Sequence, residues 1–345
     1  MSSLHTWVRR MWADTAGVGG TLTRAALLPG ELLFRAGVAL RREGYDRGVL
    51  SAEQGAIPVV SVGNLSVGGT GKTPLSSWMV RQLEAHGEQP ALVVRGYGRD
   101  EMLLHANWTP TVPVIADPDR REGVREAARQ GATVAILDDG FQHRRLGREA
   151  DVVLVAAEEG LPGALLPRGP FREPAAALAR AHAVVVTRKS GTADAAQGLA
   201  VEIRRRFPEV VTRTVHLAPG GLRPLSNWPE AEPGTPSGPI TVATAVARPE
   251  TVRASVQAAG HEVRLLETFP DHHEFTTHDL DRLLERSGGG AIVVTEKDAV
   301  KLAGLPGVPR APFWVLGQVL EWDQDPNPLV DTVLERIRRR KGAGS

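Results

Sequence analysis

The sequence predicts an α/β protein: a P-loop NTPase-like parallel sheet, a second, smaller α/β domain and an N-terminal amphipathic helical region. Apolar runs of strand length alternate with helical patterns over most of the 345 residues, and a glycine-rich turn follows the first run. Such alternation is typical of a parallel sheet that helices cover on both faces. We expect the helical region in residues 1–50, the nucleotide-binding domain in 51–235 and the smaller domain in 236–345.

Composition narrows the classes of function. Hydrophobic residues make up 42% and charged residues 23%, values typical of a globular protein, and the net charge of +1 gives no reason to expect a nucleic-acid partner. The absence of cysteine excludes disulfides and thiolate metal sites and fits a reducing compartment. No run of about 18 uncharged apolar residues and no cleavable signal is evident. We therefore expect a cytoplasmic location.

Residues 1–50 combine tryptophan, leucine and arginine, with seven arginines against four acidic residues. Between residues 31 and 43 an apolar stripe recurs at helical spacing, made of Leu32, Leu33, Ala36, Gly37 and Leu40. Helices of this kind lie in membrane interfaces, and they also occur as helical hairpins packed on a domain. The residues alone leave both interpretations open.

The predicted elements of the nucleotide-binding domain follow a β-α rhythm. Strands are expected near 57–62, 91–95, 134–137, 151–155 and 183–187, with helices at 72–86 and 120–130. Residues 188–235 contain turn and linker composition and one strand candidate at 210–217. Ligands of such sheets bind at the carboxyl ends of the strands.

The smaller domain is predicted to resume the same rhythm. We expect strands at 240–244, 262–267, 291–295 and 313–316, and helices at 249–259, 277–286 and 328–340. The basic run from Arg338 to Lys341 is interpreted as a solvated helix end, where cations are favoured.

The glycine-rich turn predicts a phosphate site between the first strand and the first helix of this domain. Its backbone N–H groups can surround a polyphosphate, Lys72 can reach the β- and γ-phosphates, and the Thr73 hydroxyl can bind Mg²⁺. Ser66 stands where the strict motif has glycine, and the alternative is a purely structural turn. The predicted nucleotide-binding residues are Ser66, Val67, Gly68, Gly69, Thr70, Gly71, Lys72 and Thr73.

Acidic residues follow the strand predicted at 134–137. Asp138 and Asp139 precede Gly140 and come at the carboxyl end of that strand, where a phosphate loop needs a partner for Mg²⁺. Adjacent residues of an extended chain face opposite ways, so one acid could bind the metal while the other orients or caps. The structural alternative is a capping aspartate.

Two further loops follow predicted strands. Residues 95–101 place Asp100 and Glu101 after a glycine turn, and residues 165–174 contain Arg168, Arg172 and Glu173. Arginines in such loops suit phosphate oxygens, because the planar guanidinium donates to two oxygens at once. For Arg168, an exposed-loop role is equally compatible with the sequence.

The smaller domain carries one histidine pair, His272 and His273, within residues 269–275. A zinc site lacks cysteines and a second histidine pair, so a hydrogen-bonded turn or a histidine that orients a catalytic carboxylate remains. The segment Thr295–Asp298 has Lys297 directly beside Asp298, which does not match the spacing of a guanine-recognition motif.

Taken together, these motifs resemble the tetraacyldisaccharide 4′-kinase family. The segments that carry the resemblance, in the family's order, are 62–74, 95–98, 138–146, 165–174, 269–273 and 295–302. The run from Asp138 to His143 is the most specific of them. The family's basic, apolar N-terminal helix is membrane-associated, which favours the interfacial interpretation of residues 1–50.

The resemblance implies transfer of the ATP γ-phosphoryl group to the 4′-hydroxyl of a tetraacylated glucosamine disaccharide 1-phosphate, giving lipid IVA, at the cytoplasmic face of the inner membrane. It implies Asp100 as the catalytic aspartate, His272 as its partner and Lys72 as a further catalytic residue. Acids near the metal and phosphates are Asp138, Asp139 and Glu173, and basic site residues are Arg120 and Arg172. The implied cofactors are ATP and Mg²⁺.

The chain departs from the family's pattern at two places. Only Arg99 separates Gly98 from Asp100, where the family usually has a longer insertion, and residues 243–249 lack the family's common glycines. Alternative functions are a P-loop kinase for another sugar or lipid, and a nucleotide-dependent switch that is not a kinase.

Overall fold

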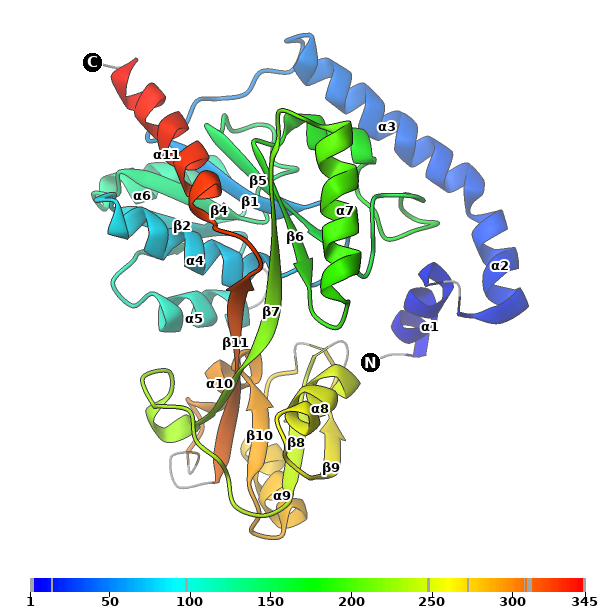
Figure 1. Cartoon of the computed structure of the whole chain (residues 1–345), viewed down its shortest axis with the longest axis vertical. Helices are drawn as coiled ribbons and strands as arrows, with labels where there is room; N and C mark the ends of the chain where they lie inside the picture. Colours follow the sequence, from blue (N-terminus) through cyan, green and yellow to red (C-terminus); the bar gives the residue numbers. More distant parts are fainter. Residues whose placement is uncertain are drawn as a thin grey trace. The chain divides into compact units, whose positions relative to one another are not determined.

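A computed structural model of the chain describes residues 3–13, 15–96, 99–246, 249–271, 273–306, 308 and 312–343. The chain divides into two compact units (Figure 1). The larger unit comprises Thr6–Gly96, Thr109–Leu217 and Leu320–Ser345, and the smaller comprises Met1–His5, Tyr97–Trp108 and Ala218–Val319. This division differs from the expected boundary at 235 between the two α/β domains, because residues 99–108 belong to the smaller unit and the C-terminal segment belongs to the larger one.

The larger unit contains a parallel sheet in the order β3-β2-β4-β1-β5-β6-β7. Its strands are β1 (Val59–Asn64), β2 (Pro90–Val94), β3 (Val114–Ala116), β4 (Val134–Asp138), β5 (Ala150–Ala156), β6 (Ala183–Arg188) and the part of β7 (Val211–Pro224) up to Leu217. β1, β2, β4 and β5 are fully buried, as continuous apolar strands predict. The predicted parallel sheet is confirmed.

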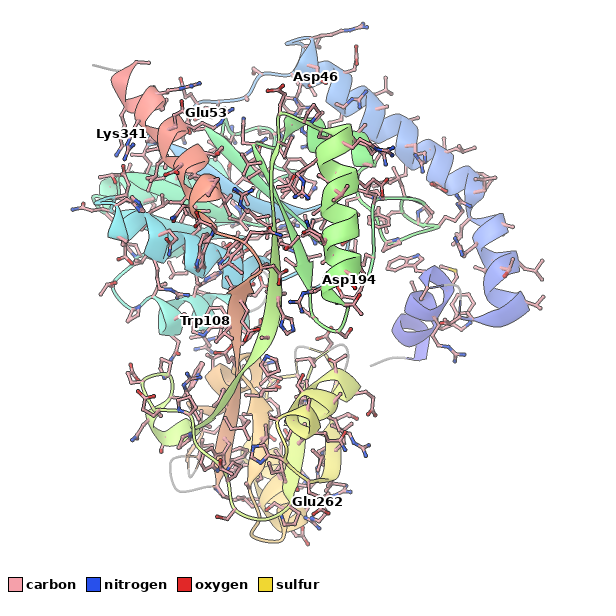
Figure 2. The ribbon with its side chains drawn as sticks, viewed as in Figure 1. Asp46, Glu53, Trp108, Asp194, Glu262 and Lys341 are labelled. Carbon is pink, nitrogen blue, oxygen red and sulfur yellow. The ribbon has the colours of Figure 1, made fainter. Side chains whose placement is uncertain are left out.

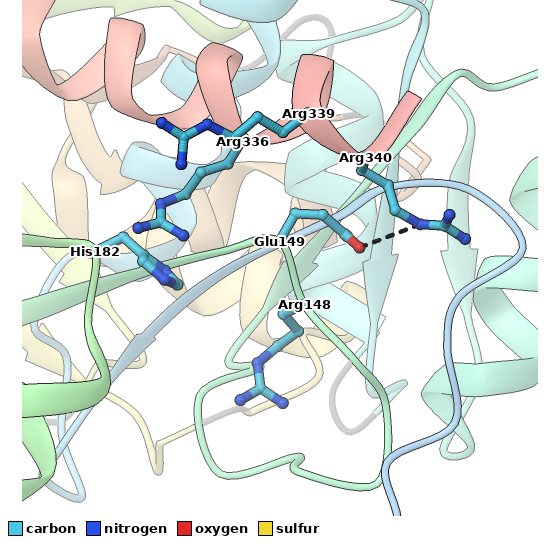
Figure 3. Close-up of a pocket in the computed structure, with 6 residues that line it drawn as sticks. All are labelled: Arg148, Glu149, His182, Arg336, Arg339 and Arg340. Atoms are coloured by element: carbon cyan, nitrogen blue, oxygen red, sulfur yellow. Dashed lines mark ion pairs between the residues drawn. The ribbon is translucent and has the colours of Figure 1, made fainter. Parts of the chain in front are cut away.

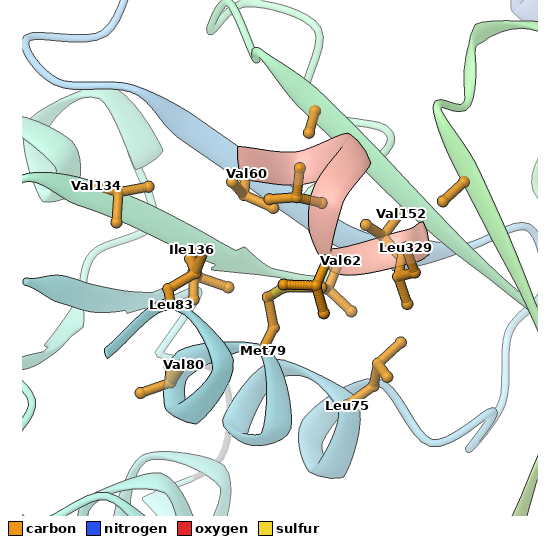
Figure 4. Close-up of a cluster of buried hydrophobic side chains, with 14 of the residues drawn as sticks. Val60, Val62, Leu75, Met79, Val80, Leu83, Val134, Ile136, Val152 and Leu329 are labelled. Carbon is orange, nitrogen blue, oxygen red and sulfur yellow. The ribbon is translucent and has the colours of Figure 1, made fainter. Parts of the chain in front are cut away.

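Helices cover both faces of this sheet. On one face, α4 (Lys72–Ala85) and α11 (Asn327–Gly342) bury Met79, Leu83 and Leu329 against Val62 and Ile136 (Figure 4). On the other face lie α6 (Arg120–Arg129) and α7 (Ala193–Arg206). The two-sided cover leaves the strand ends as the places where polar side chains gather.

The smaller unit contains parallel strands β8 (Ile240–Thr244), β9 (Val263–Thr268) and β10 (Ile292–Thr295), together with part of β11 (Phe313–Trp322), in the order β11-β10-β8-β9. On one face pack α5 (Arg99–Trp108), α9 (Thr277–Ser287) and α10 (Glu296–Leu302). On the other packs α8 (Pro249–Ala258).

Three helices form the N-terminal region: α1 (Ser3–Trp12), α2 (Gly17–Ala26) and α3 (Leu28–Asp46). The long helix α3 contains the predicted stripe between residues 31 and 43 and continues beyond it at both ends. Its last residue, Asp46, is labelled in Figure 2. Leu32, Leu33 and Leu40 are 57%, 76% and 74% exposed. Among the described residues, no helix has the length and apolar character needed to cross a bilayer.

The opposite side of α3 is anchored by Glu31, which is only 1% exposed. Its carboxylate accepts hydrogen bonds from Leu165 N (2.9 Å), from Arg35 Nε (2.9 Å) and from Arg168. Arg168 therefore holds α3 on the loop that follows β5, and it is not simply an exposed loop residue. Trp12 adds a hydrogen bond to Pro167 O at 3.0 Å.

The strand candidate at 210–217 is confirmed by β7, but the sequence analysis expected no helix in residues 188–235, where α7 lies. Thr192 caps α7 by accepting from Ala195 N, and three arginines fill its last turn. Its buried face consists of Ala196, Ala200 and Ile203. Because alanine is only weakly hydrophobic, this buried face gives little of the apolar periodicity by which a helix is predicted from sequence.

Candidate active site

The segment after β1 forms the predicted phosphate loop. Gly71 adopts φ 93° directly before α4, and a Cβ there would lie 2.5 Å from Leu217 Cδ1. The positive φ therefore favours glycine, and an added Cβ would also require the Leu217 side chain to move. Lys72 and Thr73 begin α4, where helix N–H groups and the helix dipole favour an anion.

Asn64, the last residue of β1, links the loop to its surroundings. Its buried amide donates to Thr70 Oγ1 at 2.9 Å and to Gly68 O at 3.4 Å. Its side-chain oxygen accepts from Arg172. Asn64 therefore connects the phosphate loop with the loop that carries Arg172.

Residues 165–174 run beside the start of the phosphate loop. Val67 N donates to Pro170 O at 2.8 Å, and Arg172 N donates to Leu65 O at 2.7 Å. This backbone pairing explains how Arg172, more than 100 positions after Asn64, reaches the same end of the sheet.

Asp139 is the centre of a cationic cluster. Arg172 donates to both of its oxygens, with Nη2 at 2.9 Å and Nη1 at 3.1 Å, and Lys72 Nζ lies 3.7 Å from Oδ1. Burial by itself would raise the pKa of Asp139. The hydrogen bonds from Arg172 and the charges of Lys72, Arg172 and Arg120 outweigh it, so the pKa lies below its ordinary value.

Asp138 and Asp139 differ in backbone as well as in environment. Asp138 is the last residue of β4 and pairs with Val62 of β1 in the parallel register. Asp139 has φ 57°, a positive value that no other non-glycine residue has in the described part of the chain. The two acids therefore do not alternate along an extended strand as expected, because the chain turns at Asp139.

Arg120, the first residue of α6, is 3% exposed. It donates to Asp117 O at 2.7 Å and to Asp138 O at 3.3 Å. Burial lowers its pKa to about 10, although Asp138 and Asp139 oppose the shift. Arg120 is therefore still charged near neutral pH and lies at the end of β4.

Glu173 is already engaged by protein groups. Arg180 donates to both oxygens, at 2.9 and 3.2 Å, and Gln142 Nε2 donates to Oε1 at 3.0 Å. Gln142 Nε2 also donates to Asn64 O at 2.9 Å. Through Gln142, Glu173 is linked to the end of β1. Its predicted contact with a metal stays a prediction.

The smaller unit contains Asp100, another predicted catalytic residue. Asp100 lies in the first turn of α5 and is 3% exposed, whereas its neighbour Glu101 lies 3.8 Å from Lys297 in an exposed ion pair. His272 lies outside the described residues. His273 Nε2 lies 3.0 Å from Asp279 Oδ2 and its ring stacks on Phe269, so this histidine belongs to a hydrogen-bonded, packed turn.

Sequence reasoning missed three residues of the site: Asn64, Gln142 and Arg180. Asn64 and Gln142 lie in the segments 62–74 and 138–146 that carry the family resemblance. Their amide side chains predict hydrogen bonding but do not indicate the partner. Arg180 belongs to no motif. It packs over Phe141, with Cζ 4.3 Å from the ring centroid, while it pairs with Glu173.

A basic pocket of about 370 Å³ lies elsewhere in the larger unit (Figure 3). It is lined by Arg148, Glu149, His182, Arg336, Arg339 and Arg340. Residues 148–149 and 182 precede β5 and β6, so the pocket lies at the amino ends of strands whose carboxyl ends face the phosphate-loop side. Arg148 pairs with Asp151, Arg339 with Glu335 and Arg340 with Glu149, so three of the four lining arginines have acidic partners. This pocket is not the candidate site.

The oxygen groups at the phosphate loop suit Mg²⁺. Within the described ranges, no group of three or more His, Asp or Glu side chains could hold a metal ion by itself. A Mg²⁺ ion bound together with phosphates needs only one or two protein carboxylates. The carboxylate of Asp138 and the hydroxyl of Thr73 are hard oxygen donors of the required kind.

Comparison with known proteins identifies the family. Residues 23–338 match the family model described as LpxK, tetraacyldisaccharide-1-P 4′-kinase. A tetraacyldisaccharide 4′-kinase of Anaeromyxobacter dehalogenans (strain 2CP-C) is 39% identical over 323 residues, covering 84% of each chain. One of Halorhodospira halophila is 38% identical over 341 residues, covering 93% of this chain and 96% of the relative.

A solved structure agrees with the sequence comparison. The crystal structure of the "apo" form of LpxK from Aquifex aeolicus, in complex with ATP, superposes with a TM-score of 0.73 at 26% identity. The match covers 91% of this chain and 99% of that one. The phosphate loop, the cluster around Asp139 and these matches lead to one conclusion: the chain belongs to the tetraacyldisaccharide-1-P 4′-kinase family.

Proposed function

We propose that this chain transfers the γ-phosphoryl group of ATP to the 4′-hydroxyl of tetraacyldisaccharide 1-phosphate, giving lipid IVA in lipid A biosynthesis. The observation that carries the proposal is the cluster of Lys72, Arg172 and Asp139 beside the phosphate loop. Fixed cations at a helix N-terminus suit a reaction whose main requirement is charge stabilisation on transferring phosphate oxygens.

Each cation has a role in this scheme. The loop N–H groups and Lys72 bind the β- and γ-phosphates, while Arg172 and Arg120 neutralise charge on the group in transfer. Asp139 keeps Lys72 and Arg172 oriented when phosphate is absent. Thr73 and Asp138 would hold Mg²⁺, which when bound neutralises charge on the phosphate oxygens.

Asp100 is proposed as the residue that receives the proton of the sugar hydroxyl. The 4′-oxygen forms a bond to the γ-phosphorus, the bond from that phosphorus to the β–γ bridging oxygen breaks, and ADP leaves. The hydroxyl proton passes to Asp100, and His272 is proposed to orient this carboxylate.

The N-terminal helices are proposed to lie at the membrane surface, which would place the enzyme peripherally at the cytoplasmic face of the inner membrane. Support comes from the exposed leucines of α3, which lie on the side opposite the buried Glu31. Such a surface suits a lipid substrate, because an enzyme at the membrane can reach the sugar while the acyl chains remain in the bilayer.

The decisive experiment measures transfer of labelled γ-phosphate from ATP to tetraacyldisaccharide 1-phosphate in detergent micelles. The wild type is compared with Asp100→Asn, Asp100→Ala and the neighbouring control Glu101→Ala. We expect both Asp100 variants to lose roughly 10²- to 10⁴-fold in rate, and Glu101→Ala to stay within a few-fold of wild type, with ATP binding retained throughout.

Three other outcomes would change the proposal. A wild type that binds ATP but transfers nothing to this acceptor would exclude the substrate. Transfer retained by the Asp100 variants would move the proton acceptor elsewhere, and loss in Glu101→Ala alone would identify Glu101. Unfolding midpoints of the variants show whether a loss reflects chemistry or folding.

A further inference from the structure

We propose that Lys189 is a positioning residue for the phosphates of ATP, because it holds the Gly69 carbonyl of the phosphate loop away from the bound anion. Lys189 directly follows β6, and β6 is separated from β1 by β5 alone. No sequence motif marks it. The inference rests on the proposed function, since it assumes that the loop binds ATP.

Three consecutive carbonyl oxygens of the loop are occupied. Gly68 O accepts from Thr70 N at 3.1 Å, Gly69 O accepts from Lys189 Nζ at 2.8 Å, and Thr70 O accepts from Thr187 Oγ1 at 2.9 Å. A carbonyl oxygen pointing at a phosphate would repel it. Lys189 and Thr187 therefore hold two of these oxygens away from a bound nucleotide.

The hydrogen bond from Thr187 to Thr70 O also orients an N–H group of the loop, because the peptide unit is planar. The Thr70 carbonyl and the Gly71 N–H belong to one trans peptide unit and point in opposite directions. Because Thr187 fixes the carbonyl toward β6, the Gly71 N–H is turned away from β6. Gly71 precedes the first residue of α4, where N–H groups bind anions.

Lys189 is itself firmly anchored through its backbone. Glu158 Oε1 accepts from the N–H groups of Lys189, Ser190 and Gly191, at 2.6, 2.9 and 2.9 Å. Burial by itself would raise the pKa of Glu158, but these backbone hydrogen bonds bring it below its ordinary value. An ionised carboxylate thus fixes the start of the lysine side chain while its ammonium group reaches Gly69.

The test compares Lys189→Ala, Lys189→Arg and the adjacent control Ser190→Ala, whose side chain lies outside this network. ATP affinity is measured by calorimetry, and KM and kcat by the transfer assay. Loss of one charge-assisted hydrogen bond predicts that Lys189→Ala raises Kd and KM for ATP about tenfold, with kcat changed less. Arginine, which still donates to Gly69 O, should restore most of the affinity.

A second pair of variants tests the hydrogen bonds to the phosphate-loop carbonyls without changing charge. Thr187→Val removes the hydroxyl on Thr70 O and should weaken ATP binding, whereas Thr187→Ser should not. Equal ATP affinity in Lys189→Ala and Ser190→Ala would overturn the inference.

Lys72→Ala separates the two levels of the argument. If the wild type itself binds no ATP, the proposed function fails. If Lys72→Ala loses ATP while Lys189→Ala keeps it, only the role of Lys189 fails. Unfolding midpoints without nucleotide identify any variant that is misfolded.

Discussion

Arg172 donates to both carboxylate oxygens of Asp139, at 2.9 and 3.1 Å, although 33 positions separate the two residues. Asp139 accepts this pair from a left-handed backbone conformation that costs a non-glycine residue of order 1–3 kcal/mol. The pair and the nearby Lys72 offset that cost. A strained residue that gathers two cations beside a phosphate loop is best explained by binding of an anion.

Replacing Arg172 by lysine should lower kcat/KM for ATP by about 10- to 100-fold, because lysine cannot donate to both Asp139 oxygens in one plane. The transfer assay at varied ATP measures the effect. Arg206→Lys is the matched control, since Arg206 is exposed and pairs with Glu202 on α7. Equal kinetics for Arg172→Lys and the control would contradict this role.

Replacing Glu173 by glutamine should destabilise the fold by roughly 3 kcal/mol, because it leaves a mostly buried Arg180 without its counter-charge. Chemical denaturation measures the change. A structural role predicts that the concentration of Mg²⁺ giving half-maximal activity stays unchanged. A clear rise in that concentration would instead support Glu173 as a metal ligand.

The smaller unit should lose stability as pH rises toward 7. Burial raises the pKa of Glu296 to about 7, against opposing hydrogen bonds from Trp108 and Gln318 N and the charge of Arg223. The folded state binds the Glu296 proton more tightly than the unfolded state does. The stabilisation from this proton is therefore fully present below pH 4.5 and is lost as pH rises through 7. The loss is at most about 3 kcal/mol.

Unfolding of the wild type, Glu296→Gln and the exposed control Glu101→Gln at pH 5 and pH 8 measures this effect. Glutamine keeps a hydrogen-bond acceptor but does not titrate. The free energy of unfolding of Glu296→Gln should therefore rise relative to wild type from pH 5 to pH 8, while that of Glu101→Gln should not. Parallel pH profiles for all three proteins would rule out the titration of Glu296 as the cause.

Changing Leu33 and Leu40 together to glutamate should weaken binding to anionic lipid vesicles by more than about tenfold. Each leucine side chain that enters the membrane contributes roughly 1.5–3 kcal/mol to binding. Both side chains are about three-quarters exposed, at 76% and 74%, so the unfolding midpoint should not change. Val201→Glu, at an exposed position of α7, is the control in a vesicle sedimentation assay. Unchanged sedimentation of the double variant would favour a helical region that only packs on the protein.

The sequence allowed prediction of the parts of the site that follow from the parallel sheet. Lys72 and Asp138 were expected at one edge because both follow strands of a parallel sheet, and the register of β1 with β4 shows that these two strands are neighbours. The pairing of Arg172 with Asp139 could not be predicted in this way. It depends on the turn at Asp139 and on the backbone pairing of Arg172 with Leu65, both of which arise only in the folded chain.

Glu31 connects α3 to the loop of residues 165–174, which also carries Arg172. A chain shortened to begin after residue 50 would leave the Leu165 N–H and the Arg168 guanidinium without their acceptor, only a few positions before Arg172. Activity lost on truncation could then reflect a distorted phosphate site as readily as lost membrane contact. Point substitutions on the outer surface of α3 are therefore the better way to obtain a detergent-free preparation that still performs catalysis.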